Sequence, residues 1–168
     1  FSKRELFFLT NIKEELEFII TTIRKQYTYS TFDKNMKEKE VYVNKDRNIK
    51  VTFMGKIDKV LYKEEDDITY LVVIDYKTGS AISELEHGEN NINLKNMEYG
   101  LGLQLPIYLY LSSKMELKNV KVVGFYLQKL FNTTLDNSKD YDTAKENNLR
   151  LEGYSIDEEN ILSKFDTN

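Results

Sequence analysis

The chain has 168 residues, a formal net charge of −4 and 40% hydrophobic residues, which is typical of one globular domain with its own core. Because it contains no cysteine, it cannot form disulfides, zinc ribbons or iron–sulfur clusters by itself, and it is compatible with a reducing cytoplasm. No apolar run reaches about 18 residues, which excludes a membrane-spanning helix. The negative net charge provides no overall basic field to gather nucleic acid.

The N-terminal region carries two helix-start signals, each a capping residue followed three positions later by glutamate. They are Ser2 with Glu5, and Asn11 with Glu14. Apolar residues then recur at helical spacing, so we predict a helix over about 11–26 whose apolar stripe packs on the core. The first residues lack both a signal-peptide pattern and an initiator methionine, so we expect the chain to be a piece of a longer protein.

Three strands are predicted to follow a loop at residues 28–34. Residues 38–43 alternate between polar and apolar side chains, as a half-buried strand does. Strands at 51–61 and 70–77 come next, with the acidic run 63–67 as the turn between them. The three strands should form an antiparallel meander.

The second half of the chain is predicted to hold one more strand and two helices. A polar connection at 80–96 leads to a helix over about 98–113 and then to a strand at 120–130. Residues 132–149 are polar without periodicity, so we expect a surface excursion or a partly disordered segment there. A short terminal helix should begin at the capping signal in residues 155–158 and continue through Phe165.

Asp75 and Lys77 end the most apolar run of the chain, residues 71–74. Side chains two apart in a strand share a face, so this acid and this amine should emerge side by side from the core. An unpartnered charge is costly in that position. The pair alone is also explained by an ordinary structural ion pair.

Asp58 supplies a second acid to the same place. Facing residues of a hairpin have a constant sum of residue numbers, and a hairpin centred between Asp66 and Asp67 puts Asp58 opposite Asp75. Two carboxylates so placed can share a divalent cation, and a neighbouring ammonium offsets developing negative charge. We therefore predict a site made of Asp58, Asp75 and Lys77 that is suited to metal-assisted attack of water on a phosphodiester.

Gln104 and Tyr108 form a third feature, because residues four apart lie on one face of a helix. Pro106 between them lacks an amide proton, so the helix either starts close to it or bends there. An amide and a phenol on one helical face suit contacts to phosphate oxygens or to a nucleophilic water. An ordinary amphipathic helix would carry the same pattern.

Three motif blocks, in this order and spacing, carry a resemblance to a known family. They are Gly55-Lys56-Ile57-Asp58, Asp75-Tyr76-Lys77-Thr78-Gly79 and Gln104-Leu105-Pro106-Ile107-Tyr108. The chain resembles the PD-(D/E)xK nuclease superfamily in its RecB-like branch, and most of all the nuclease domains of AddB/RexB-type proteins. The resemblance implies an α/β fold with a restriction-endonuclease-like core. Its mixed central sheet, an antiparallel meander plus a further strand, would be flanked by helices.

The resemblance also implies a metal site. Magnesium, with manganese as a substitute, would be bound by Asp58, Asp75 and the backbone carbonyl of Tyr76, and Lys77 would position or activate the attacking water. Such nucleases commonly have a histidine ligand ahead of the first strand. None precedes the first motif block here, so we expect it upstream of this sequence. His87, in the polar connection, is interpreted as a solvated loop residue.

The remaining implications concern substrate and partners. Gln104 and Tyr108 would contact the DNA strand near the scissile phosphate, and Glu40 is a further candidate acid. Such a domain is a cytoplasmic exonuclease that degrades single strands of duplex ends unwound by a helicase–nuclease complex with an AddA-like partner, in double-strand-break repair and recombination. ATP hydrolysis would belong to motor domains elsewhere, because the chain has no Gly-x-x-x-x-Gly-Lys-Ser/Thr loop. An iron–sulfur cluster is expected, if anywhere, in the full-length protein and not in this chain.

We therefore expect residues 1–168 to form a single nuclease domain. Two alternatives stay open at this point: a non-catalytic module of the same fold that guides single-stranded DNA, and a free-standing RecB-like or phage exonuclease. Metal uptake that depends on the two acids would argue against the first alternative. The length of the parent gene would decide the second.

Overall fold

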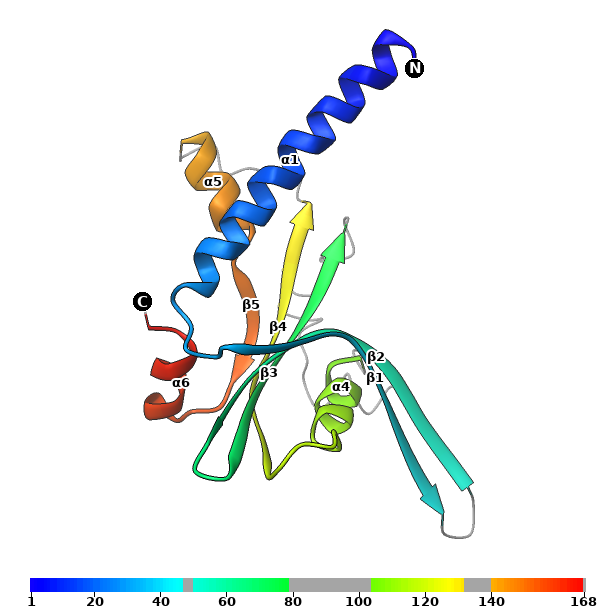
Figure 1. Cartoon of the computed structure of the whole chain (residues 1–168), viewed down its shortest axis with the longest axis vertical. Helices are drawn as coiled ribbons and strands as arrows, with labels where there is room; N and C mark the ends of the chain where they lie inside the picture. Colours follow the sequence, from blue (N-terminus) through cyan, green and yellow to red (C-terminus); the bar gives the residue numbers. More distant parts are fainter. Residues whose placement is uncertain (47–49, 79–103, 132–139, 168) are drawn as a thin grey trace, which may run out of the picture.

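Five strands, paired in chain order, form one mixed sheet in the computed structural model, which describes residues 1–46, 50–78, 104–131 and 140–167. Helices flank this sheet, and the N-terminal helix extends well beyond it (Figure 1). The elements are α1 (Lys3–Tyr27), β1 (Lys34–Asp46), β2 (Lys50–Glu65), β3 (Ile68–Thr78), α4 (Gln104–Ser112), β4 (Val120–Phe131), α5 (Tyr141–Asn148), β5 (Leu151–Ser155) and α6 (Glu159–Phe165).

The pairing of the strands confirms the predicted topology. β1, β2 and β3 form an antiparallel meander, β4 pairs parallel to β3, and β5 pairs antiparallel to β4. A parallel neighbour requires a crossover, and α4 lies in the connection that provides it. The fold is thus the α/β, restriction-endonuclease-like arrangement expected from the sequence.

The hairpin of β2 and β3 has the predicted register. Its pairs run from Lys59↔Ile74 to Glu65↔Ile68, so the centre falls between Asp66 and Asp67. These two aspartates have φ angles of 50° and 65°, the left-handed region that two-residue hairpin turns require and that aspartate tolerates. The turn is shorter than the predicted 63–67, because the strands continue to the two aspartates.

The sheet is buried on both faces. One face packs against α4 in an apolar cluster that includes Val73 and Leu111. The other packs against α6 in a second cluster that includes Ile74 and Phe165, with Tyr27 at the end of α1 against its edge. Successive residues of β3 therefore enter different clusters, which explains why this strand is apolar throughout and not alternating.

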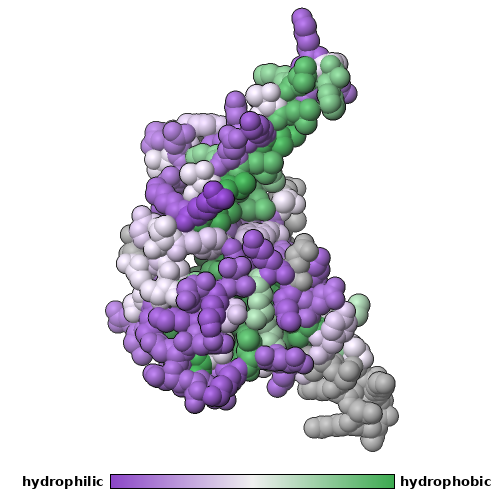
Figure 2. All heavy atoms as spheres, in the orientation of Figure 1, coloured by the Kyte–Doolittle hydropathy of each residue, from purple (hydrophilic) through white to green (hydrophobic). Residues whose placement is uncertain are grey.

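Helix α1 begins earlier than predicted. Ser2 and Glu5 form a closed capping box, with Ser2 N donating to Glu5 Oε2 at 2.6 Å and Glu5 N donating to Ser2 Oγ at 3.3 Å. The predicted start near residue 11 was wrong, because the first of the two capping signals is the one used. The N-terminal half of α1 leaves the body of the molecule and carries exposed apolar side chains (Figures 1 and 2), including Phe7 and Phe8.

Two elements near the C-terminus were not predicted. Residues 141–148 form α5 and not a surface excursion, with the Asp140 carboxylate accepting from Thr143 N at 3.0 Å and a single buried anchor, Ala144. One small buried side chain gives no detectable periodicity. β5 was missed for a similar reason: it is a short edge strand whose residues, apart from half-buried Leu151, are exposed.

The other helices and strands match their predictions apart from the ends. The predicted connection at 80–96, with His87, and the first part of the predicted helix at 98–113 lie outside the described residues. The described part of that helix begins at Gln104, two residues before Pro106. None of the described helices combines the length and the apolarity that crossing a bilayer requires.

Candidate active site

The end of β3 brings Asp75 and Lys77 together on one face of the sheet. Val73, two residues earlier, belongs to the cluster under α4, so strand alternation puts Asp75 and Lys77 on that face too. Asp75 is 3% exposed, and its Oδ2 lies 2.6 Å from Lys77 Nζ. The pair is a charge-assisted contact at the boundary between core and solvent, because 27% of the Lys77 side chain remains exposed.

Asp58 reaches the same place from β2. The pairing of β2 with β3 covers Lys59 to Glu65, whereas its pairing with β1 extends back to Lys50, so β2 leaves β3 next to Asp58. Where the backbone pairing of β2 with β3 ends, the Asp58 side chain makes the next contact between the two strands. Tyr76 N donates a hydrogen bond to Asp58 Oδ2 at 2.9 Å. This bond fixes the Asp58 carboxylate beside the Asp75–Lys77 pair.

The electrostatics of the site favour a cation. Burial raises the pKa of Asp75, and the nearby Asp58 carboxylate raises it further, while the Lys77 ammonium acts in the opposite direction. Two carboxylates that share one place interact unfavourably until positive charge balances them. Lys77 supplies one such charge, and a divalent cation would supply more.

The donor set fits a hard divalent cation. Carboxylate oxygens are ligands that Mg²⁺ and Mn²⁺ prefer, and Asp58 and Asp75 present them from neighbouring strands. Within the described ranges no group of three or more His, Cys, Asp and Glu side chains could hold a metal. The described residues thus offer two acids at this place, and the Tyr76 backbone carbonyl stays a predicted third ligand.

The other predicted site residues lie on α4 and on β1. Gln104 and Tyr108 both lie on α4, but the Gln104 side chain is outside what the structure describes. The Tyr108 ring is half-buried against the sheet, with its centroid 6.3 Å from that of Phe125. Glu40 is exposed on β1, where its carboxylate accepts from Tyr42 OH at 3.0 Å.

Gly55, in the first motif block, sets the position of α4. A Cβ atom on Gly55 would lie 2.5 Å from Leu111 Cδ1 and 3.6 Å from Tyr108 Cε1. A real Cβ would not fit at the first distance unless the Leu111 side chain or α4 moved, so glycine at position 55 permits this close packing. The same contact holds Tyr108 over the sheet face that carries Asp75.

Two buried lysines lie on the strands next to the site residues, Lys59 with its ammonium on the opposite face of the sheet, and neither was predicted. Lys59, 7% exposed, follows Asp58 on β2, and burial lowers its pKa to about 8. Lys129, 5% exposed, is the register partner of Lys77 on β4 and lies 3.4 Å from Glu152. The signal that could have found them is a lysine inside an otherwise apolar strand.

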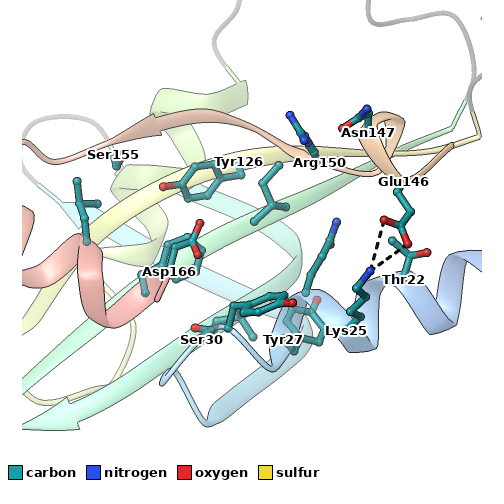
Figure 3. A pocket seen from close by; sticks show the side chains of 16 residues that line it. Thr22, Lys25, Tyr27, Ser30, Tyr126, Glu146, Asn147, Arg150, Ser155 and Asp166 are labelled. Carbon is teal, nitrogen blue, oxygen red and sulfur yellow. Dashed lines mark hydrogen bonds and ion pairs between the residues drawn. The ribbon is translucent and has the colours of Figure 1, made fainter. Parts of the chain in front are cut away.

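A cavity of about 660 Å³ lies on the opposite side of the sheet (Figure 3). Side chains of α1, β4, α5 and α6 line it, and the Lys25–Glu146 ion pair, at 3.2 Å, spans α1 and α5 there. Asp58, Asp75 and Lys77 are not among its lining residues. The cavity is therefore separate from the acidic site.

Comparison with known proteins agrees with the geometry. Residues 5–164 match the PD-(D/E)XK nuclease superfamily. The chain is 33% identical over 127 residues to a subunit of the ATP-dependent helicase/deoxyribonuclease of Carboxydothermus hydrogenoformans, a match that covers 70% of this chain and 11% of the relative. It is 34% identical over 116 residues to the corresponding subunit of Lachnoclostridium phytofermentans, covering 69% of this chain and 9% of the relative.

A third relative matches along nearly the whole chain. The helicase/deoxyribonuclease subunit of the same name from Clostridioides difficile is 26% identical over 182 residues, which cover 98% of this chain and 15% of the relative. The chain thus spans between 9% and 15% of the length of these three relatives.

Proposed function

Because the chain belongs to the PD-(D/E)XK nuclease superfamily, we propose that its acidic site is a metal-dependent deoxyribonuclease site that hydrolyses phosphodiester bonds of single-stranded DNA. The observation that carries this proposal is the convergence of Asp58, Asp75 and Lys77. Two acids from neighbouring strands and one amine meet where β2 separates from β3.

Each side chain has a role in the proposed reaction. Asp58, Asp75 and the Tyr76 carbonyl would hold Mg²⁺, with Mn²⁺ as a substitute. The bound cation would polarise the phosphate and lower the pKa of a water molecule. Lys77, held by Asp75 and partly open to solvent, would position the attacking water and would offset negative charge on the phosphate. Burial of Asp75 keeps bulk water away from one side of the site.

The substrate and setting follow from α4 and from the relatives. Gln104 and Tyr108 would contact the DNA strand next to the scissile phosphate. The relatives are each named as a subunit of an ATP-dependent helicase/deoxyribonuclease. We propose that this domain likewise acts as an exonuclease on single strands delivered by a helicase-bearing partner subunit, in cytoplasmic double-strand-break repair and recombination.

The experiment that tests this proposal compares variants of the full-length protein, assembled with its partner subunit, on single-stranded DNA with Mg²⁺. Asp75→Ala and Lys77→Met should each slow cleavage by about 100-fold or more, as expected when a metal ligand or a charge-stabilising group is removed. Asp33→Ala, at an exposed position ahead of β1, is the matched control and should cut normally. Undiminished cutting by Asp75→Ala would end the assignment.

Calorimetry distinguishes the enzyme from a non-catalytic module of the same fold. The parent should take up Mn²⁺, and the Asp58→Ala and Asp75→Ala variants should not. Uptake that is the same in all three proteins would place the metal elsewhere and would favour the guiding module.

A further inference from the structure

The last turn of α1 lies directly behind the acidic site, on the opposite face of the sheet. Its final residue, Tyr27, contacts β2 and β3 at the positions next to the two acids. Tyr27 also lines the cavity on that face (Figure 3). These contacts join residues about thirty to fifty positions apart in the sequence.

The first contact is with β2. Lys59 Nζ donates a hydrogen bond to the Tyr27 hydroxyl and lies 3.7 Å from the centroid of the Tyr27 ring. Lys59 is 7% exposed, so it has little access to water as an alternative partner. A buried ammonium that has one hydroxyl acceptor and one aromatic face is held firmly, because leaving them would be costly. Lys59 is the residue next to Asp58.

The second contact is with β3. Tyr27 and Tyr76 pack in the same apolar cluster on this face, where their phenols interact, and burial raises the pKa of both phenols. Tyr76 lies between Asp75 and Lys77, and its backbone N–H is the group that holds Asp58. Tyr27 therefore joins β2 to β3 across the point where their backbone ladder ends.

A third contact fastens the same helical turn to β4. Gln128 is the register partner of Tyr76 and is 1% exposed. Its Nε2 donates to Gln26 Oε1 at 2.9 Å and to the Leu149 carbonyl at 2.8 Å. Gln26 Nε2 donates to the same carbonyl at 2.9 Å. Adjacent residues of α1 thus hold three neighbouring strands at the level of the site.

We infer that Tyr27 is a positioning residue of the nuclease site: through Lys59 and Tyr76 it sets the separation of the Asp58 and Asp75 carboxylates and hence the affinity for the divalent cation. This inference rests on the proposed function. Tyr27 acts on the two acids through the neighbouring residues Lys59 and Tyr76. Loss of a hydrogen bond made directly to a metal ligand typically lowers metal affinity by about 10- to 100-fold, so we expect the lower end of that range here.

The test uses the full-length protein and Mn²⁺ as the probe. Tyr27→Phe removes only the hydroxyl that joins the strands, and Lys59→Met removes the ammonium at similar volume. Each should raise the Kd for Mn²⁺ by about 10-fold and lower kcat by a similar factor, with the KM for DNA changed less than about twofold. Lys59→Arg, which keeps a donor for Tyr27, should recover most of the affinity.

Matched controls lie on the same strands and face, farther from the acids. Tyr70→Phe on β3 and Lys63→Met on β2 should leave Mn²⁺ affinity and kcat unchanged. A merely structural role for Tyr27 would reduce the active fraction without changing the Kd for Mn²⁺, and that result would overturn the inference. If the parent takes up no Mn²⁺ through Asp58 and Asp75, the proposed function fails, and this inference fails with it.

Discussion

Burial makes Asp75 unfavourable for folding in the absence of metal. The pKa of its carboxyl is raised by burial and by Asp58, more than Lys77 lowers it. A carboxyl with a higher pKa in the folded than in the unfolded chain binds its proton more tightly when folded. The ionisation of Asp75 therefore lowers the free energy of unfolding. The loss develops as the pH rises from 3.8, the ordinary pKa of aspartate, through the higher pKa that Asp75 has in the folded chain.

Asp75→Asn should consequently stabilise the metal-free protein at neutral pH. We expect a gain of about 1 kcal/mol, or about 3 °C in Tm, because the amide carries no charge into the core. The difference from the parent should disappear at acid pH, once the aspartate is protonated in both states. Thermal unfolding at several pH values in the presence of a chelator measures it.

Asp33→Asn is the matched control, because it makes the same change at an exposed position. It should not change the stability in a pH-dependent way. If Asp75→Asn is less stable than the parent at neutral pH, then the ion pair with Lys77 outweighs the cost of burial, and the prediction is wrong.

The acidic residues could be placed from the sequence, whereas their supports could not. Register arithmetic needs only the position of a turn, and it put Asp58 opposite Asp75. Tyr27, by contrast, meets Lys59 and Tyr76 through tertiary packing of a helix on a sheet. No local period or spacing encodes that contact, and in the sequence Tyr27 looks like one more apolar position of a helical stripe.

At the scale of elements, the turn that closes the β2–β3 hairpin consists of two residues that are not the preferred ones for its backbone conformation. Asp66 and Asp67 both have positive φ angles, for which Asn-Gly is the preferred pair. The double change Asp66→Asn/Asp67→Gly should stabilise the protein by about 0.5–1 kcal/mol. The exposed ion pair of Asp67 with Lys118 would be lost, but such surface pairs contribute little.

Urea unfolding measures this gain through the midpoint at an unchanged slope. The proposed DNA-cleaving activity should stay the same, since the turn lies at the opposite end of the hairpin from Asp58. A loss of stability would mean that the turn has a different backbone conformation.

The contact of α4 with β2 yields a second prediction about elements. Gly55→Ala would bring a methyl group within 2.5 Å of Leu111 Cδ1, so the Leu111 side chain or α4 must shift, at a cost of about 1–3 kcal/mol. Leu111→Ala alone should cost about 2–5 kcal/mol, because it leaves a cavity in the core. In the double variant the alanine methyl group has room. The loss in the free energy of unfolding should therefore be smaller than the sum of the losses in the two single variants.

A double-mutant cycle measured by denaturant unfolding gives the coupling free energy directly. Costs that add without coupling would show that the alanine at position 55 is accommodated in another way, and that the helix does not depend on the glycine.

The elements that were predicted correctly are those that bury long apolar rows. β3 is recognisable because nearly every residue enters one of two clusters, and the strand at 120–130 for the same reason. α5 and β5 bury little more than Ala144 and part of Leu151. Such elements are held by the neighbours they pack on, and a sequence pattern cannot show those neighbours.

For the whole molecule, the uneven burial of α1 is the feature with a measurable consequence. Its C-terminal half packs on the sheet and on α5, where Glu15 pairs with Lys145 and Thr22 is buried. Its N-terminal half extends away from the sheet, and Figure 2 shows the apolar side chains that it leaves exposed. Among the described residues, Glu15 is the first of α1 to bond with another element.

Deletion of residues 1–9 should therefore leave the stability of the domain nearly unchanged. The shortened helix would begin at Asn11, which has Glu14 at the position needed for a second capping box, so the new end can be capped. We expect a Tm within about 2 °C of the parent, since the removed residues bury little area against the body.

Removal of Phe7 and Phe8 should also reduce concentration-dependent association, because exposed apolar patches promote it. Thermal unfolding and sedimentation at several protein concentrations measure both effects, and a large fall in Tm would show that the N-terminal half contributes packing in solution.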